Sequence, residues 1–179
     1  MTFFPRKDDH SAVWKLGELA QYQINGLWPQ ASGRAVSMGG KTPSETNVIS
    51  FVETASTGNF TDFGDLSSSK YNMGSGSSGV RGLSLGGYDG YPSQSSVIDV
   101  LHFATTGNAA HMGSLSSGRG STTGASNENI SLSLGHGDNT AGYSNVIDRT
   151  NNASIGTATD FGDLTQSRGQ GASVNNATV

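Results

Sequence analysis

The sequence predicts an all-β protein built from three repeats of about 49 residues. The 19 residues from Val48 to Leu66 align without a gap on Val97 to Leu115 and on Val146 to Leu164. Only 33% of the 179 residues are hydrophobic, whereas 26 are glycine, so there is little apolar material for a helical core. Short strands joined by Gly-, Ser- and Asn-rich turns fit this composition. A period near 50 residues is typical of an array or a propeller.

The repeat extends beyond this block on both sides. The run from Arg34 to Gly40 recurs as Arg81 to Gly87 and, more loosely, as Ile130 to His136. Each aligned block is followed by a basic residue, which is Lys70, Arg119 or Arg168. The units are therefore expected at about residues 33–78, 79–128 and 129–179, which leaves residues 1–32 outside the array.

Each unit is expected to contain strands that are separated by glycine turns. Val48–Glu53 and Val97–His102 carry β-branched residues with partial alternation, which predicts strands. Thr57-Gly58-Asn59 and its counterpart at 106–108 predict turns after these strands, because Gly and Asn tolerate left-handed backbone. The glycine pair Gly86-Gly87 is followed by no phosphate-loop lysine and is expected to end a strand.

The segment Thr61-Asp62-Phe63-Gly64-Asp65-Leu66 recurs identically at residues 159–164. Its paired carboxylates raise the possibility of a calcium site. The middle unit has His111 and Ser114 in place of the two aspartates, whereas the glycine and the leucine occur in all three units. A structural turn is therefore the main expectation for Asp62, Asp65, Asp160 and Asp163, with calcium binding as the alternative.

The N-terminal residues 1–32 follow a different pattern. Ser11 can cap a short helix over residues 13–24, after which Asn25-Gly26 and Pro29 stop it. The apolar residues of this segment predict either a cap over an open edge of the array or an attachment peptide, and the residues expected to form the attachment are Val13, Trp14, Leu16, Leu27 and Trp28.

The remaining composition gives little sign of enzymatic chemistry or of a cofactor. Cysteine is absent, and the net charge of −4 offers no electrostatic footprint for nucleic acid. The sequence contains no run of 18 apolar residues, so no membrane-spanning helix is predicted. The first ten residues lack the pattern of a secretory signal. The four histidines stand in different contexts, without metal-ligand spacing. We therefore expect no catalytic residues, no metal and no cofactor.

The repeat resembles the kelch-like repeats of tail and other virion proteins of bacteriophages, particularly phages of aquatic bacteria and cyanobacteria. Gly58-Asn59, Asp62–Leu66 and Gly86-Gly87 carry the resemblance, which covers residues 33–179. Val13–Leu16 and Gly26–Pro29 are similar to a short segment of phage structural proteins. The resemblance implies three propeller-blade units, and these follow the short, mostly helical N-terminal segment expected from its residues. In function it implies a virion structural protein, tail- or fibre-associated.

Alternative functions are a capsid decoration protein and, with less support, a glycan-cleaving propeller enzyme. If the protein is fibre-associated, its polar loops are expected to contact host surface glycans through Tyr88, Tyr91, His136 and Tyr143. The alternative hypothesis is that these loops only keep the turns soluble. The partners expected are other virion proteins, bound through the N-terminal segment, and further copies of the chain. Propellers need about four to eight blades, so three units predict a dimer of 3 + 3 blades, a trimer or a capped open array.

Overall fold

The computed structural model describes residues 33–138 and 142–175, and this part of the chain is entirely β. Its strands form three antiparallel sheets, and no helix occurs among these residues. The predicted all-β class is confirmed. The helix expected over residues 13–24 lies outside the described residues.

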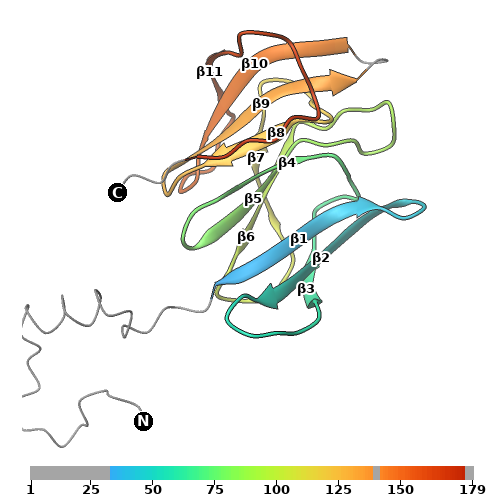
Figure 1. Cartoon of the computed structure of the whole chain (residues 1–179), viewed down its shortest axis with the longest axis vertical. Helices are drawn as coiled ribbons and strands as arrows, with labels where there is room; N and C mark the ends of the chain where they lie inside the picture. Colours follow the sequence, from blue (N-terminus) through green and yellow to red (C-terminus); the bar gives the residue numbers. More distant parts are fainter. Residues whose placement is uncertain (1–32, 139–141, 176–179) are drawn as a thin grey trace, which may run out of the picture. The chain divides into compact units, whose positions relative to one another are not determined.

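The three sheets follow one another in the sequence (Figure 1). The first sheet contains β1 (Arg34–Lys41), β2 (Glu45–Glu53) and β3 (Thr61–Asp65). The second contains β4 (Gly74–Ser77), β5 (Arg81–Leu85), β6 (Val97–His102) and β7 (Ala110–Ser114). The third contains β8 (Thr123–Ser126), β9 (Ile130–Asp138), β10 (Gly142–Asn151) and β11 (Thr159–Asp163).

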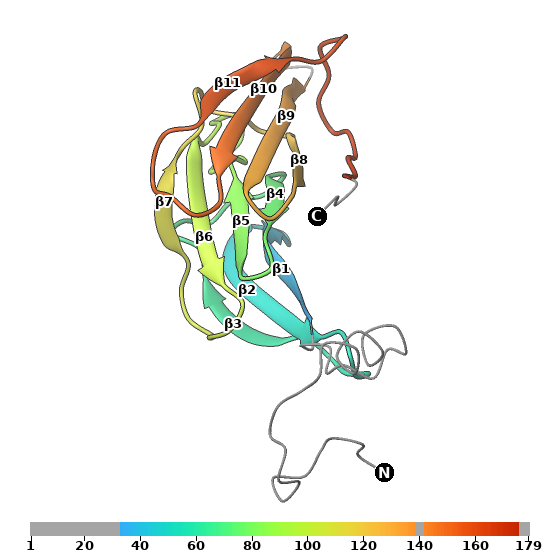
Figure 2. The same cartoon turned by 90° about the vertical axis from the view of Figure 1, so that its left-hand side faces the viewer.

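The sheets are arranged in series, each packed against the next (Figure 2). The short strand β4 contacts both β8 and β9, so neighbouring sheets approach one another through their first strands. Within the described residues the series is open and no ring of sheets closes. The repeat is therefore present as three consecutive antiparallel sheets.

The boundaries between sheets differ from the boundaries between sequence units. β4 lies within the first sequence unit, residues 33–78, but pairs with β5 of the second sheet. β8 is likewise assigned by sequence to residues 79–128 but pairs with β9 of the third sheet. The first and second units therefore each end by crossing over and contributing the first strand of the following sheet.

The strands predicted at residues 48–53 and 97–102 are confirmed as β2 and β6. The turn predicted at the Thr-Asp-Phe-Gly-Asp segments is wrong, because both copies form strands, β3 and β11. Gly64 and Gly162 have φ values of 144° and 140°. Each lies at a register shift against the preceding strand, where left-handed backbone makes a β-bulge rather than a chain reversal.

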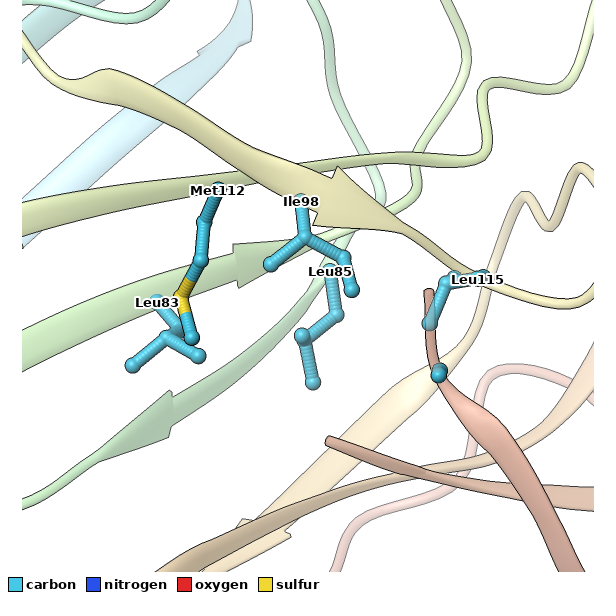
Figure 3. Close-up of a cluster of buried hydrophobic side chains, with 6 residues drawn as sticks. Leu83, Leu85, Ile98, Met112 and Leu115 are labelled. Carbon is cyan, nitrogen blue, oxygen red and sulfur yellow. The ribbon is translucent and has the colours of Figure 1, made fainter. Parts of the chain in front are cut away.

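Two apolar clusters hold the three sheets together. The cluster between the second and third sheets contains Leu83, Leu85, Ile98, Met112 and Leu115, which converge from β5, β6, β7 and the residue after β7 (Figure 3). It also includes Ala158, the residue before β11. The cluster between the first and second sheets contains Ile49, Phe63 and Leu66 together with Leu101. Each sheet therefore presents its large apolar side chains to the sheet that follows it.

Candidate assembly faces

A buried ion pair joins each sheet to the next. Lys70 Nζ lies 2.9 Å from Asp99 Oδ2 on β6, and Arg119 Nη2 lies 3.0 Å from Asp148 Oδ1 on β10. All four side chains are fully buried or nearly so. The basic residue always belongs to the earlier unit and the aspartate to the later one. The order of base and acid along the chain is therefore the same at both sheet junctions.

Hydrogen bonds support both pairs in the same way. Ser67 Oγ donates to Asp99 over 2.7 Å, and Ser116 donates through its amide and its hydroxyl to Asp148 over 2.8 Å. The Arg119 guanidinium also donates to the Val146 carbonyl over 2.8 Å. Such bonds are what makes a buried ion pair tolerable, because desolvation of each charge is costly.

The pairing scheme is left incomplete at both ends of the described array. Position 50 in the first sheet is equivalent to Asp99 and Asp148 but holds a serine. Arg168 is equivalent to Lys70 and Arg119, yet it is exposed, and its guanidinium donates to the Gln166 carbonyl rather than to a carboxylate of the described residues. The first sheet thus lacks the acid, and the third unit carries a base without an acid beside it.

Main-chain hydrogen bonds repeat between the sheets as well. The Gly107 and Ala109 amides donate to the Phe63 and Asp65 carbonyls over 2.7 and 2.8 Å. Counterparts 49 residues later join Gly156 to Met112 and Ala158 to Ser114, over 3.1 and 2.7 Å. The next carbonyls in this series, Phe161 and Asp163, lie on β11, whose outer edge pairs with no strand of the described chain.

The third sheet leaves exposed or half-buried several apolar side chains whose counterparts in the second sheet are buried. Phe161 is 57% exposed, whereas the equivalent Phe63 and Met112 are 3% and 1% exposed. A cavity of about 210 Å³ lies beside it, lined in part by Ile130 and Leu132. We call the following set the third-sheet face: Leu132, Leu134, Ile147, Phe161, Leu164 and Arg168.

The first sheet has the complementary surface at its other side. Gly82 and Ser84 of β5, and Ser131 and Ser133 of β9, are buried where a sheet meets the preceding one. Their equivalents in β1 are Ala35 and Ser37, and neither is buried. We call the following set the first-sheet face: Ala35, Ser37, Ser50 and Val52.

The structure divides the four residues predicted to contact glycans. Tyr91 and Tyr143 are 48% and 51% exposed, but Tyr88 is only 1% exposed, so the expectation of a displayed Tyr88 was wrong. Its ring lies 5.4 Å from that of Tyr71 and 5.4 Å from that of Tyr91. A Cβ atom on Gly120 would collide with the Tyr88 ring, which shows how closely the chain packs over it.

His136, the fourth of these residues, lies on strand β9. It is half-buried on β9 and is paired with Ser144 across the sheet, next to the register position of Tyr143. Burial lowers the pKa of His136 below 6.5, and the Arg119 charge lowers it further, against a smaller opposing effect of Asp148. A neutral imidazole is thus favoured in the folded protein.

The predicted attachment residues Val13, Trp14, Leu16, Leu27 and Trp28 lie outside the described residues. Within residues 33–138 and 142–175, no group of three His, Asp or Glu side chains is placed to hold a metal ion. Asp160 instead accepts a hydrogen bond from the Gly162 amide over 3.0 Å.

The residues that the sequence reasoning missed are the aspartates of the ion pairs. The recurrence of Lys70, Arg119 and Arg168 is visible in the alignment, and so is an aspartate at positions 99 and 148. The signal was the exact 49-residue offset between these two aspartates, together with the serine at position 50. A polar residue inside a predicted strand gave no reason by itself to expect a buried charge.

No helix in the described part of the chain is long and apolar enough to cross a membrane. Comparison of the chain with models of known protein families and with curated proteins finds no match. Function is therefore inferred from the repeats, their residues and the open faces.

Proposed function

We propose that this protein is a non-enzymatic structural component of a bacteriophage virion, tail- or fibre-associated, in which the β repeats form a display and assembly module. The observation that carries the assembly part is the third-sheet face, because the same apolar positions are buried by a following sheet elsewhere in the chain. Contiguous exposed apolar surface of this kind is typical of interaction sites. The assignment to a virion is supported by the resemblance of the repeat sequence.

Residues 1–32 attach the module to the particle in this proposal. The segment carries both tryptophans of the chain, Trp14 and Trp28, and aromatic side chains often dominate the binding energy of an interface. Tyr91 and Tyr143, which are the exposed tyrosines of the predicted contact set, contact host surface glycans in this proposal.

Removal of residues 1–32 is expected to abolish incorporation into particles while the remaining repeats stay folded and β-rich. Trp14→Ala and Trp28→Ala are expected to reduce incorporation without changing the β-sheet circular dichroism signal. Incorporation is measured by quantitative mass spectrometry of purified particles, with Tyr143→Ala as a control for a general effect of losing an aromatic residue.

Antibody labelling of intact particles separates the two structural roles. Label along the tail or fibre supports the proposal, whereas label distributed over the capsid identifies a decoration protein. Normal incorporation of the truncated chain contradicts the role of residues 1–32 as the anchor. Aggregation of the truncated repeats identifies the segment as a cap over the array.

A further inference from the structure

We propose that the third-sheet face docks onto the first-sheet face of a second copy of this chain, so that the internal stacking of the sheets continues from one molecule to the next. This inference rests on the assembly role proposed above and names its partner. The two internal junctions, from first to second sheet and from second to third, define the contacts that the junction between copies repeats.

The residue types on the two faces match those at the internal junctions. Inside the chain, Leu83 and Leu85 of the second sheet belong to an apolar cluster that includes the small residue Ala158 of the third unit. Ser131 of the third sheet packs closely against Gly76 of the second sheet. The third-sheet face supplies the large apolar side chains Leu132, Leu134, Ile147 and Phe161. The first-sheet face supplies Ala35, Ser37 and Val52 at the receiving positions.

The main-chain hydrogen bonds continue in the same register. Each internal junction uses two amides of the later unit, and their equivalents in the first unit are the amides of Gly58 and Phe60. No hydrogen bond within the described chain engages either amide. They are expected to donate to the carbonyls of Phe161 and Asp163 in the neighbouring copy.

Glycine positions along the third strands show the space for this contact. A Cβ atom on Gly64 or Gly113 would collide with the carbonyl of Gly107 or Gly156 in the following unit. The equivalent Gly162 has nothing within 4 Å of its Cβ position. This empty space is where Gly58 of the second copy would lie.

Two strand edges also complement each other. β1 pairs with β2 only, so its other edge has no partner among the described residues, whereas β5 and β9 are covered there by β4 and β8. Residues 171–175 lie about 49 residues after β8, as β8 lies 49 residues after β4. Ser173 Oγ donates a hydrogen bond to the Gly124 carbonyl, and Gly124 in turn packs closely against Ser75 of β4. Addition of this segment to β1 of a second copy would complete a four-stranded sheet.

The register of this strand addition follows from the internal pairs. Ser75 faces Ser84 across the β4–β5 pair, and Gly124 faces Ser133 across the β8–β9 pair. The next pair in the series joins Ser173 of one copy to Ser37 of the other.

The ion pair is the one internal contact that this junction lacks. At the internal junctions Lys70 pairs with Asp99 and Arg119 pairs with Asp148. At the junction between copies Arg168 faces Ser50 instead, so its guanidinium has a hydroxyl and a main-chain carbonyl as acceptors but no carboxylate. The junction between copies is therefore weaker than the internal ones, and association is reversible. A head-to-tail contact of this kind closes into a ring if its rotation allows and otherwise grows into a filament.

The experiment measures the mass of the full-length chain by sedimentation equilibrium over a range of concentrations. Wild type is expected to associate reversibly, with a closed pair of copies as the predicted species. Ser50→Asp supplies the missing carboxylate to Arg168 and is expected to tighten each junction by about tenfold or more. Phe161→Glu places a charge in the apolar contact and is expected to abolish association, while Val80→Glu, at an exposed apolar residue in the β4–β5 turn, leaves it unchanged.

A chain that stays monomeric both as wild type and as Ser50→Asp overturns the inference. So does association that survives Phe161→Glu, because the copies then meet through another surface. Tightening by Ser50→Asp that persists in the double variant with Arg168→Gln also contradicts the proposed contact. None of these outcomes bears on incorporation into particles, so a failure here is distinguishable from a failure of the proposed function.

Discussion

Asp148→Ala is expected to lower the free energy of unfolding by about 3–5 kcal/mol, because it leaves the Arg119 guanidinium buried without its carboxylate. Denaturant titration followed by circular dichroism measures this loss. The matched control is Ser50→Ala, which changes the equivalent position of the first sheet, where no basic side chain lies opposite within the described chain. It is expected to change the stability by less than about 0.5 kcal/mol.

A double variant separates the ion pair from the packing around it. Arg119→Met combined with Asp148→Leu removes both charges and is expected to recover most of the loss, since an apolar pair of similar volume can replace a buried ion pair. A loss of under 1 kcal/mol in Asp148→Ala alone would show that the pair does not hold the second and third sheets together.

Tyr88→Ala is expected to lower the free energy of unfolding by about 3–5 kcal/mol, since it removes a buried ring from between Tyr71, Tyr91 and the backbone of Gly120. Thermal and denaturant unfolding measure the effect. Tyr143→Ala, at a ring that is 51% exposed, is the control and is expected to have little effect on stability. Unchanged stability in Tyr88→Ala, together with a loss of binding to host cells, would restore Tyr88 as a surface contact.

The repeat and its strands were predictable because they depend on local patterns. The β-branched residues at 48–53 and 97–102 alternate in a way that a strand requires, and the 49-residue offset is visible by direct alignment. The strand at Thr61–Asp65 was mistaken for a turn, because left-handed glycine occurs both in turns and in β-bulges. Its pairing with β2 decides between the two, and pairing is not a local property.

The candidate site was less predictable because it depends on which sheet each strand joins. β4 belongs to the first unit in sequence but completes the second sheet, and this crossover brings Lys70 to Asp99. Tyr88 was expected at the surface because its neighbours are Gly, Asp and Pro residues, which are typical of loops. Its burial arises from packing against Tyr71 and Gly120, which lie far from it in the sequence.

Amide hydrogen exchange at Gly58 and Phe60 tests most directly whether the array continues from one copy to the next. If the third-sheet face of a second copy covers the first sheet, exchange of these two amides slows as the protein concentration rises, while the amide of exposed Ile155 exchanges at a constant rate. The protection is expected to increase in Ser50→Asp and to disappear in Phe161→Glu. Exchange at Gly58 and Phe60 that is independent of concentration, under conditions where the chain is seen to associate, would contradict this arrangement.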